Sequence, residues 1–414
     1  MDLESLKRHL RRTTKLLRAY KTEIDPTEEQ KRIVRQGIGI CRYLYNLYLA
    51  KNKELYDLFN QGILDKKQAF MSANDFDKFI NNEIKTQEEF SWINECGSKA
   101  RKKAICNAET AFKRFFKGQS KFPRFKKKKN QDIQIYFPKN NKGDWKVERH
   151  RLKIPTLGWA MLKEKGYILT NADVTSGTVT FKANRYYVSV LIDVKANNDY
   201  STPCNQGIGI DLGIKDLAIV NTIDKPFKNI NKTKKVKKLE KKLKREQRKL
   251  SRKYESLKVR NKNIKKEGGI ATRQNIQKQV VKVQKLHQTL SNIRENYANQ
   301  VVNEIVKTKP SYITIEDLNV KGMMKNRCLA KAVAKQNFYG FKVKLTNRCK
   351  FNNIELRVVD RWYPSSKTCC ECGSIKKDLK LSDREYVCPV CGFILDRDKN
   401  ASINLANAKI YKVA

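Results

Sequence analysis

Four cysteines near the C-terminus constrain the fold of this chain more than any other feature. They form two pairs with two intervening residues each, Cys369 with Cys372 and Cys388 with Cys391. Two such pairs can meet at one tetrahedral zinc ion, with Zn–S bonds of about 2.3 Å, if each pair closes a tight turn. Gly373 and Gly392 follow the pairs and permit that turn. We therefore predict one structural zinc ion. Its closed set of four thiolates leaves no position for catalysis.

The other cysteines have simpler interpretations. No stretch of about 18 apolar residues occurs, and charged residues begin at Asp2, so we expect a soluble protein that is not secreted. Disulfides are disfavoured in that setting, which favours zinc for the two pairs. Cys370 lies inside the first pair, and we interpret it as a bystander rather than a ligand. Solitary cysteines in such chains are mostly small buried apolar residues. Six belong to this class: Cys41, Cys96, Cys106, Cys204, Cys328 and Cys349.

The charge balance indicates a polyanionic partner. The chain has 89 Lys and Arg against 42 Asp and Glu, a formal net charge of +47. Self-repulsion of this size opposes compaction unless it is neutralised. Nucleic acid is the favoured partner, because counterion release from phosphates rewards many basic contacts. An anionic membrane surface and a basic but solvated protein surface are the weaker alternatives. The hydrophobic share of 40% over 414 residues predicts two or three units with packed cores.

Hydrophobic patterns divide the first half of the chain. Residues 17–24 alternate loosely and predict a strand, after which residues 25–28 and 27–30 give two overlapping N-capping signals. Helical periodicity then extends through residues 28–118. From residue 133 to 194 the pattern changes to short alternating runs separated by glycines. We predict an antiparallel β unit, with a barrel as one option, which the early strand completes and the helical segment interrupts.

A pair of long basic helices is predicted in the second half. Residues 232–266 contain 18 Lys or Arg and three Glu. One apolar seam runs through this segment, formed by Leu243, Leu250 and Leu257 at intervals of seven. Gly268 and Gly269 turn the chain, and residues 276–297 continue with apolar residues at steps of three and four. We expect an antiparallel helical hairpin whose apolar seam packs internally while its basic faces contact nucleic acid.

Acidic residues end two apolar strands. Asp211 ends the run Gly-Ile-Gly-Ile-Asp, and Glu316 ends the run Ile-Thr-Ile-Glu. A carboxylate at such a position is destabilising unless a partner or a metal ion compensates its desolvation. Asp396 and Asp398 offer a third carboxylate at the start of the last helix, which we expect over residues 401–411. Three carboxylates suit Mg²⁺, and two ions could activate water for phosphodiester hydrolysis. Helix capping and salt bridges are the alternative roles.

Four motifs in this order resemble the RuvC nuclease domain of transposon-encoded TnpB proteins, a plan shared with compact type V CRISPR effectors. They are Gly-Ile-Asp211-Leu-Gly-Ile-Lys-Asp, Ile-Glu316-Asp-Leu-Asn-Val, Tyr363-Pro-Ser-Ser-Lys-x-Cys and Asp396-Arg-Asp398-x-Asn400-Ala. The segment Phe122-Pro-Arg-Phe-Lys resembles the TnpB segment after the helical insertion. The resemblance implies that Asp211, Glu316 and Asp398 are catalytic and bind Mg²⁺. Asp398 is preferred to Asp396 because it stands two residues before Asn400.

The resemblance also implies an α+β multidomain fold. Its nuclease domain would be RNase H-like, with an inserted helical hairpin and a zinc ribbon, beside a wedge β-barrel that a helical recognition domain interrupts. The expected segments are a basic extension and start of the wedge (1–27), the recognition domain (28–118), the rest of the wedge (119–200), the nuclease domain (201–364) with its hairpin (230–307), the zinc ribbon (365–395) and the C-terminal nuclease helix (396–414).

The implied activity is RNA-guided, metal-dependent cutting of DNA beside a short flanking motif. The guide would come from a transposon end or a CRISPR array, and the partners would be guide RNA, double-stranded DNA and the displaced single strand. We expect two Mg²⁺ ions, one Zn²⁺ ion, no membrane and a cytoplasmic, nucleoid-associated location in a prokaryotic cell. The alternatives are a guided repressor without nuclease activity and a transposase that performs strand transfer. The residues expected to contact phosphates are Arg124, Lys126, Lys127, Lys128, Lys241, Lys244, Arg245 and Arg248.

Overall fold

The chain divides into two units between Lys195 and Ala196, and each unit has its own hydrophobic core. The computed structural model describes residues 16–65, 67–128, 133–139, 141, 143–194, 206–266, 273–380 and 382–414. The predicted extension at residues 1–15, the turn at Gly268 and Gly269, and nearly all of the predicted linker at residues 195–206 lie outside the described residues.

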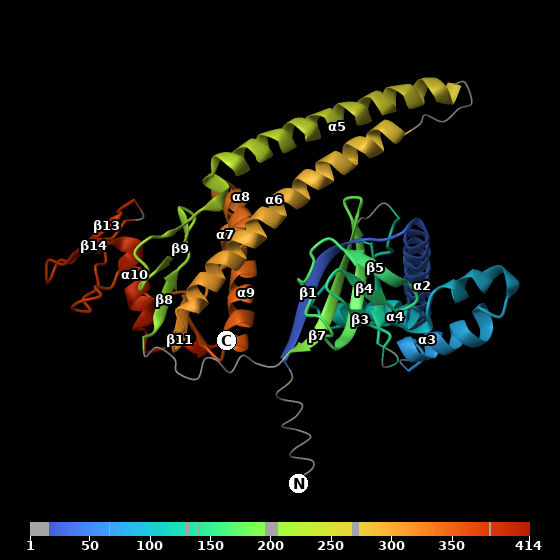
Figure 1. Cartoon of the computed structure of the whole chain (residues 1–414), viewed down its shortest axis with the longest axis horizontal. Coiled ribbons are helices and arrows are strands. Elements are labelled where there is room, and N and C mark those ends of the chain that lie inside the picture. The colour runs from blue at the N-terminus through green and yellow to red at the C-terminus, as the bar shows by residue number, and fades with distance from the viewer. Residues whose placement is uncertain are drawn as a thin grey trace, which may run out of the picture. The chain divides into compact units, whose positions relative to one another are not determined.

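A seven-stranded antiparallel sheet forms the centre of the first unit, with the order β2-β6-β7-β1-β5-β4-β3. Figure 1 labels β1, β3, β4, β5 and β7 of this sheet. Strand β1 (Leu16–Asp25) pairs with β7 (Arg185–Val194) on one side and with β5 (Gly158–Leu162) on the other. The early strand therefore belongs to the same sheet as the later ones. Among the described residues the order is open, with β2 and β3 at its edges. The other strands are β2 (Ile133–Pro138), β3 (Lys146–Val147), β4 (Arg151–Ile154) and β6 (Val174–Lys182).

Helices between β1 and β2 pack on this sheet and share its core. Of the two predicted capping signals, the structure uses the second: the Thr27 hydroxyl accepts a hydrogen bond from the Gln30 amide at 3.3 Å, and the Gln30 side chain accepts one from the Thr27 amide at 3.0 Å. The helices are α2 (Glu28–Asn60), α3 (Ala73–Phe79), η1 (Ile80–Ile84), η2 (Glu88–Glu95) and α4 (Ser98–Phe116). The helical periodicity predicted for residues 28–118 is interrupted between η2 and α4, where Cys96 has an extended backbone.

A mixed six-stranded sheet forms the centre of the second unit, with the order β10-β9-β8-β11-β12-β15. Its middle strands β8 (Ile208–Asp211), β11 (Tyr312–Glu316) and β12 (Glu355–Val359) are parallel. The flanking strands are antiparallel: β9 (Asp216–Val220), β10 (Phe227–Lys228) and β15 (Lys412–Val413). The apolar run predicted to end at Asp211 is β8.

The last helix, α10 (Arg397–Ala406), packs directly across β8. Gly209 makes this approach possible, because a Cβ atom there would overlap the carbonyl oxygen of Ser402 and the amide nitrogen of Ala406. The helix starts four residues earlier than predicted, since the Asp396 side chain caps it, and it ends at Ala406 rather than near residue 411. Strand β15 follows it, and a two-residue strand has no periodicity that could have predicted it.

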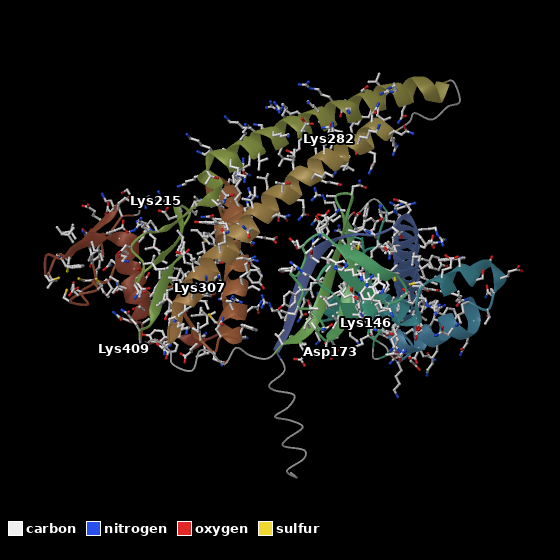
Figure 2. The ribbon with its side chains drawn as sticks, viewed as in Figure 1. Lys146, Asp173, Lys215, Lys282, Lys307 and Lys409 are labelled. Atoms are coloured by element: carbon white, nitrogen blue, oxygen red, sulfur yellow. The ribbon has the colours of Figure 1, made fainter. Side chains whose placement is uncertain are left out.

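The helical hairpin consists of α5 (Lys234–Lys266) and α6 (Gln274–Lys307), which lie side by side (Figure 1). Leu257 and Ile276 are buried between them, with Leu250 and Val280 packed alongside. The faces away from this seam are basic: Figure 2 shows nitrogen-tipped side chains along both helices, and Lys282 is one of the exposed ones. None of the helices that the structure describes is both long and apolar enough to cross a membrane.

The second unit has further helices that the sequence pattern had not predicted. The short helix η4 (Ile230–Lys232) precedes the hairpin, and α7 (Val320–Lys325), α8 (Arg327–Gln336) and α9 (Phe338–Phe351) follow β11. The residues that α9 buries are spaced by three and four, as in any amphipathic helix: Phe338, Phe341, Leu345 and Cys349. The zinc-ribbon region contains one small sheet of β13 (Glu385–Val387) and β14 (Ile394–Asp396).

Candidate active site

Asp211 and Glu316 end neighbouring parallel strands at the same edge of the second sheet. Ile210 on β8 pairs with Ile315 on β11, so the two acids that follow come next to each other. Both strands are apolar because the sheet is covered on its two faces, which is typical of parallel strands. The fold thus places two partly buried carboxylates side by side at the carboxyl ends of two neighbouring strands.

Asp398 reaches the same place from the first turn of α10, which packs on both β8 and β11. Its Oδ1 atom accepts hydrogen bonds from Nε and Nη2 of Arg397 at 3.1 and 2.9 Å. Asp396 has a different role, because its carboxylate caps α10 by accepting from the amides of Asp398 and Lys399, both at 3.0 Å. The helix cap therefore occupies Asp396 and leaves Asp398 as the third acid beside Asp211.

Burial and mutual repulsion change the acidity of these groups. Burial raises the pKa of the Asp211 carboxyl to about 8, and the negative charges of Glu316 and Asp398 act in the same direction. Burial also raises the pKa of Glu316, while its hydrogen bond with Ser365 opposes that effect. Carboxylates gathered in a poorly hydrated space repel one another unless a cation compensates their charge. Carboxylate oxygens are the ligands that a hard divalent ion such as Mg²⁺ takes, but among the described residues only the four cysteines form a group of three or more possible ligands whose ligand atoms all lie within 4.8 Å of one another.

Ser365 hydrogen-bonds to Glu316, and the sequence motifs did not identify it as a site residue. It is buried, and its hydroxyl donates a hydrogen bond to Oε1 of Glu316. Its own backbone carbonyl accepts a hydrogen bond from the buried Asn404 on α10 at 2.8 Å. The sequence signal was limited to its place in the Tyr363-Pro-Ser-Ser motif, which does not reveal what the hydroxyl contacts. A single serine thus links one acid to the helix that carries another.

The four predicted cysteine ligands converge in space. The Sγ atoms of Cys369 and Cys391 lie 3.7 Å apart, and those of Cys372 and Cys388 lie 3.5 Å apart. All four sulfurs are within 4.8 Å of one another. A tetrahedral zinc ion with bonds of about 2.3 Å would hold its sulfur ligands about 3.8 Å apart. The cluster therefore fits one structural zinc ion.

Glycines with positive φ form the turns after both cysteine pairs, as predicted, and the segment around the first cysteine pair is hydrogen-bonded to α10. Gly373 and Gly392 have φ angles of +74° and +70°, which side chains rarely adopt. Cys370 is not among the converging thiols; its amide instead donates to the side-chain oxygen of Asn400 at 3.1 Å. The amide nitrogens of Asn400 and Asn404 both donate to the carbonyl of Thr368, at 2.8 and 2.7 Å. The zinc module and the carboxylate site thus share one hydrogen-bond network.

The solitary cysteines are not all alike. Cys96 and Cys349 are buried as predicted, Cys41 and Cys106 are partly buried, and Cys328 is exposed on α8. Cys204 lies outside the described residues. Cys41 and Cys96 are neighbours in space although they are distant in sequence, with their sulfurs 3.9 Å apart.

The predicted phosphate-contacting residues fall into one group in each unit. Lys241, Lys244, Arg245 and Arg248 are exposed on α5 of the second unit. In the first unit, Arg124, Lys127 and Lys128 are exposed on the segment after α4, which Asn46 fixes by two hydrogen bonds to the backbone of Lys126. Lys126 is exposed as well, but its ammonium lies 3.7 Å from the ring centroid of Tyr45, and partial desolvation lowers its pKa. It has a partner within the protein already.

Three family models match successive parts of the chain. A model described as "Helix-turn-helix domain" matches residues 16–61, one described as "Probable transposase" matches residues 188–327, and one described as "Cas12f1-like, TNB domain" matches residues 338–405. In the structure, residues 16–61 hold strand β1 and helix α2. The third match contains the four cysteines and Asp398.

Two curated relatives match over almost the whole length, and a third matches over a shorter part. "Putative RNA-guided DNA endonuclease InsQ" of Escherichia coli is 28% identical over 95% of this chain and 92% of the relative. A "Putative RNA-guided DNA endonuclease" of Streptomyces pristinaespiralis is 28% identical over 94% of this chain and 89% of its own length. "TnpB-like protein L79" of Acanthamoeba polyphaga mimivirus is 33% identical, over 30% of this chain and 24% of the relative.

A solved structure has a similar fold. The protein chain of "Cryo-EM structure of the Cas12f1-sgRNA-target DNA complex" superposes with a TM-score of 0.56 at 14% sequence identity. The superposition covers 96% of this chain and 100% of the other. At this level of identity the likeness concerns the fold.

Proposed function

The chain belongs to the TnpB family of transposon-encoded proteins, and from that premise we propose that it is an RNA-guided DNA endonuclease. Hydrolysis of DNA would take place at the carboxylates Asp211, Glu316 and Asp398. The observation that carries this proposal is that three acids from distant segments come near the carboxyl ends of β8 and β11, close enough that the charges of Glu316 and Asp398 both raise the pKa of Asp211. The names of the two full-length relatives support the same activity.

The three acids would hold two Mg²⁺ ions, which supply the Lewis acidity needed to activate water and to neutralise the charge of the leaving oxygen. The protein's own groups would set the geometry. Ser365 fixes one oxygen of Glu316, and Arg397 holds Oδ1 of Asp398. Each of these contacts restricts the acids to one arrangement before substrate binds.

The second unit would be a RuvC-type nuclease domain with an RNase H-like core. The support is a mixed sheet in which β9 runs antiparallel to β8 while β11 and β12 continue in parallel, with an acid after β8 and after β11. The nuclease domain would span residues 201–364 and 396–414, interrupted by the zinc ribbon at 365–395. Residues 28–118 would form the recognition domain, and residues 1–27 with 119–200 the wedge.

RNA and DNA are the proposed partners of the basic surfaces. A net charge of +47 exceeds what one duplex contact needs, and two separate basic groups exist, one in each unit. Guide RNA would supply the choice of sequence by base pairing, while the protein would read the short flanking motif and the shape of the heteroduplex. The source of the guide, a transposon end or a CRISPR array, would follow from the sequence of RNA that copurifies.

The test is cutting by the purified ribonucleoprotein of plasmid DNA that carries a site matched to the guide. Asp211→Ala should abolish cutting, by at least about 1,000-fold, and leave the bound RNA unchanged, because the acid is needed only for the chemical step. Asp224→Ala, which removes an exposed acid of the same unit, is the matched control and should cut normally. Normal cutting by Asp211→Ala would contradict the proposal that these carboxylates catalyse hydrolysis.

Strand transfer is the second candidate, favoured by the match to a model described as "Probable transposase". The same acids could serve it, since the fold does not fix the reaction. Product analysis separates the two activities. Hydrolysis leaves free DNA ends, whereas strand transfer joins the ends to a second DNA.

A further inference from the structure

A cleft of about 300 Å³ opens beside Glu316 and has no role in the function proposed above. It lies within the second unit, between the segment that follows β11 and the start of α9. Leu212, the neighbour of Asp211, contributes to its wall, as do Ile315 and Glu316 themselves. Whatever enters this cleft therefore comes next to the residues proposed to bind metal.

The cleft combines an apolar floor with an aromatic ring at its rim. Phe338 and Ile315 are buried and form part of the lining. Tyr339, the next residue of α9, also lines the cleft but leaves 71% of its surface exposed. A tyrosine so exposed gains little from the protein's own packing, so its ring is free to cover a flat apolar ligand.

Two cations lie on the same cleft and are fixed by one acid. The Asp317 carboxylate accepts a hydrogen bond from Nζ of Lys342 at 3.3 Å and from Nη2 of Arg361 at 3.1 Å. All three residues line the cleft. Lysine and arginine carry three and five N–H donors, so each keeps donors for an anion while Asp317 restricts its position. The pair neutralises Asp317 and leaves one positive charge in excess.

An apolar floor, an exposed aromatic ring and fixed cations match the chemistry of a nucleotide, which has a flat base and an anionic phosphate. We propose that this cleft binds an unstacked base of the DNA strand being cut, with Tyr339 stacked on the base and Lys342 and Arg361 on a neighbouring phosphate. The proposal rests on the proposed nuclease function. DNA rather than guide RNA is the occupant, because the cleft adjoins Glu316, and only the strand to be hydrolysed must come that close.

One consequence concerns the state of the substrate. A base that is paired and stacked within a duplex cannot enter a cleft of this kind without unpairing and unstacking, which is energetically unfavourable. The site would therefore select DNA that has already been unwound. Unwinding would be a requirement of the nuclease site itself as well as a result of guide pairing.

The first test is single-turnover cutting by the ribonucleoprotein with its guide. Tyr339→Ala should slow cutting by about 5-fold to 100-fold, the range expected for loss of one base–aromatic stack. Tyr339→Phe keeps the ring and should cut at nearly the wild-type rate. Val343→Ala shortens another exposed apolar side chain of α9 that does not line the cleft, and serves as the matched control. Equal slowing by the Phe and Ala variants, or none by Ala, would overturn the stacking role.

The second test is a double-mutant cycle that combines the loss of the Tyr339 ring with the loss of a DNA base. Single abasic sites are placed in turn at each position around the cut. At one or two positions the abasic site should slow the wild type as much as Tyr339→Ala does, and it should slow Tyr339→Ala no further, because the same contact is already lost. Additive losses at every position would show that ring and base do not touch.

The outcomes separate this proposal from the function on which it rests. If the wild type does not cut guided DNA, the nuclease proposal fails. If the wild type cuts and Tyr339→Ala cuts equally fast, the cleft proposal fails alone. If Tyr339→Ala instead releases the guide RNA, measured by RNA retained per protein, the cleft binds RNA and the assignment to DNA is overturned.

Discussion

The two candidate metal sites of the second unit lie in very different surroundings. The zinc module has a small core of Cys369, Tyr386 and Cys388, against which Leu379 and Phe393 pack, and two of its cysteines are exposed. The carboxylates lie at the edge of a six-stranded sheet whose core holds sixteen buried residues. A core as small as that of the zinc module cannot hold its fold without metal, whereas the sheet can.

This contrast means that the two metals would do opposite things to stability. Zinc would supply folding free energy to a module that lacks it. At the carboxylate site, the protein would instead supply the energy that holds acids together, and the metal would relieve their repulsion. Each of the following experiments tests one side of this difference, and the largest expected effect comes first.

Loss of a zinc ligand should have the largest effect. Cys388→Ser should reduce the bound zinc from one ion per chain to none and remove roughly 10 kcal/mol of metal-binding free energy, which unfolds the module. Zinc content by mass spectrometry and hydrogen exchange over residues 365–395 would measure this. Cys370→Ser is the matched control, since its thiol is not among the converging four, and it should retain zinc. Zinc loss in both variants would contradict the ligand assignment.

Removal of the Asp211 charge should stabilise the protein, whereas loss of a zinc ligand should destabilise it. Asp211→Asn should stabilise the protein in buffer without Mg²⁺, by on the order of 2–4 kcal/mol at pH 8, because it removes a charge that burial disfavours. The folded pKa of about 8 lies above the ordinary value of 3.8, so the wild type should lose stability as pH rises between these values, and the variant should not. Thermal unfolding at pH 5 and pH 8 would measure the difference. If Asp211→Asn were less stable than the wild type at pH 8, the ionised Asp211 carboxylate would not destabilise the metal-free protein, and this prediction would be wrong.

Loss of the Ser365 hydroxyl should have a smaller effect. Ser365→Ala leaves Glu316 without its hydrogen bond, worth about 1.5–3 kcal/mol for a charged acceptor, so cutting should slow by about 10-fold to 100-fold. More Mg²⁺ should be needed for half-maximal rate, while the zinc content stays unchanged. Ser366→Ala, at the next position, is the control and should behave as wild type. An unchanged Mg²⁺ requirement in Ser365→Ala would indicate a purely structural role.

The sequence predicted the parts of the two sites whose signal is local. Cysteine spacing is such a signal, and the cysteines converge as expected. The strand-end acids were visible as Asp211 and Glu316, but their meeting depends on β11 pairing with β8, which lies about a hundred residues away and leaves no local pattern. The roles of Asp396 and Asp398 could be distinguished only by resemblance, and the helix cap now gives a physical reason.

Other features had no signal, or a signal that was overlooked. The spacing of buried residues on α9 was present in the sequence, although lysines at alternate positions obscured it. The contacts of Ser365 with Glu316 and of Asp317 with Lys342 and Arg361 arise only when loops from different parts of the chain meet. The end of α10 was predicted too late because nothing in its composition marks the short strand that follows.

Gly209 has a consequence for the choice of ion. It lets α10 lie against β8, and so it sets how close Asp398 comes to Asp211. Mg²⁺ requires oxygen ligands at about 2.1 Å in near-octahedral geometry, whereas Ca²⁺ accepts about 2.3–2.6 Å and looser shapes. A methyl group at position 209 would push the helix outward and widen the space between the acids. A residue without any functional group would thus govern ionic selectivity, with a wider site favouring the larger ion.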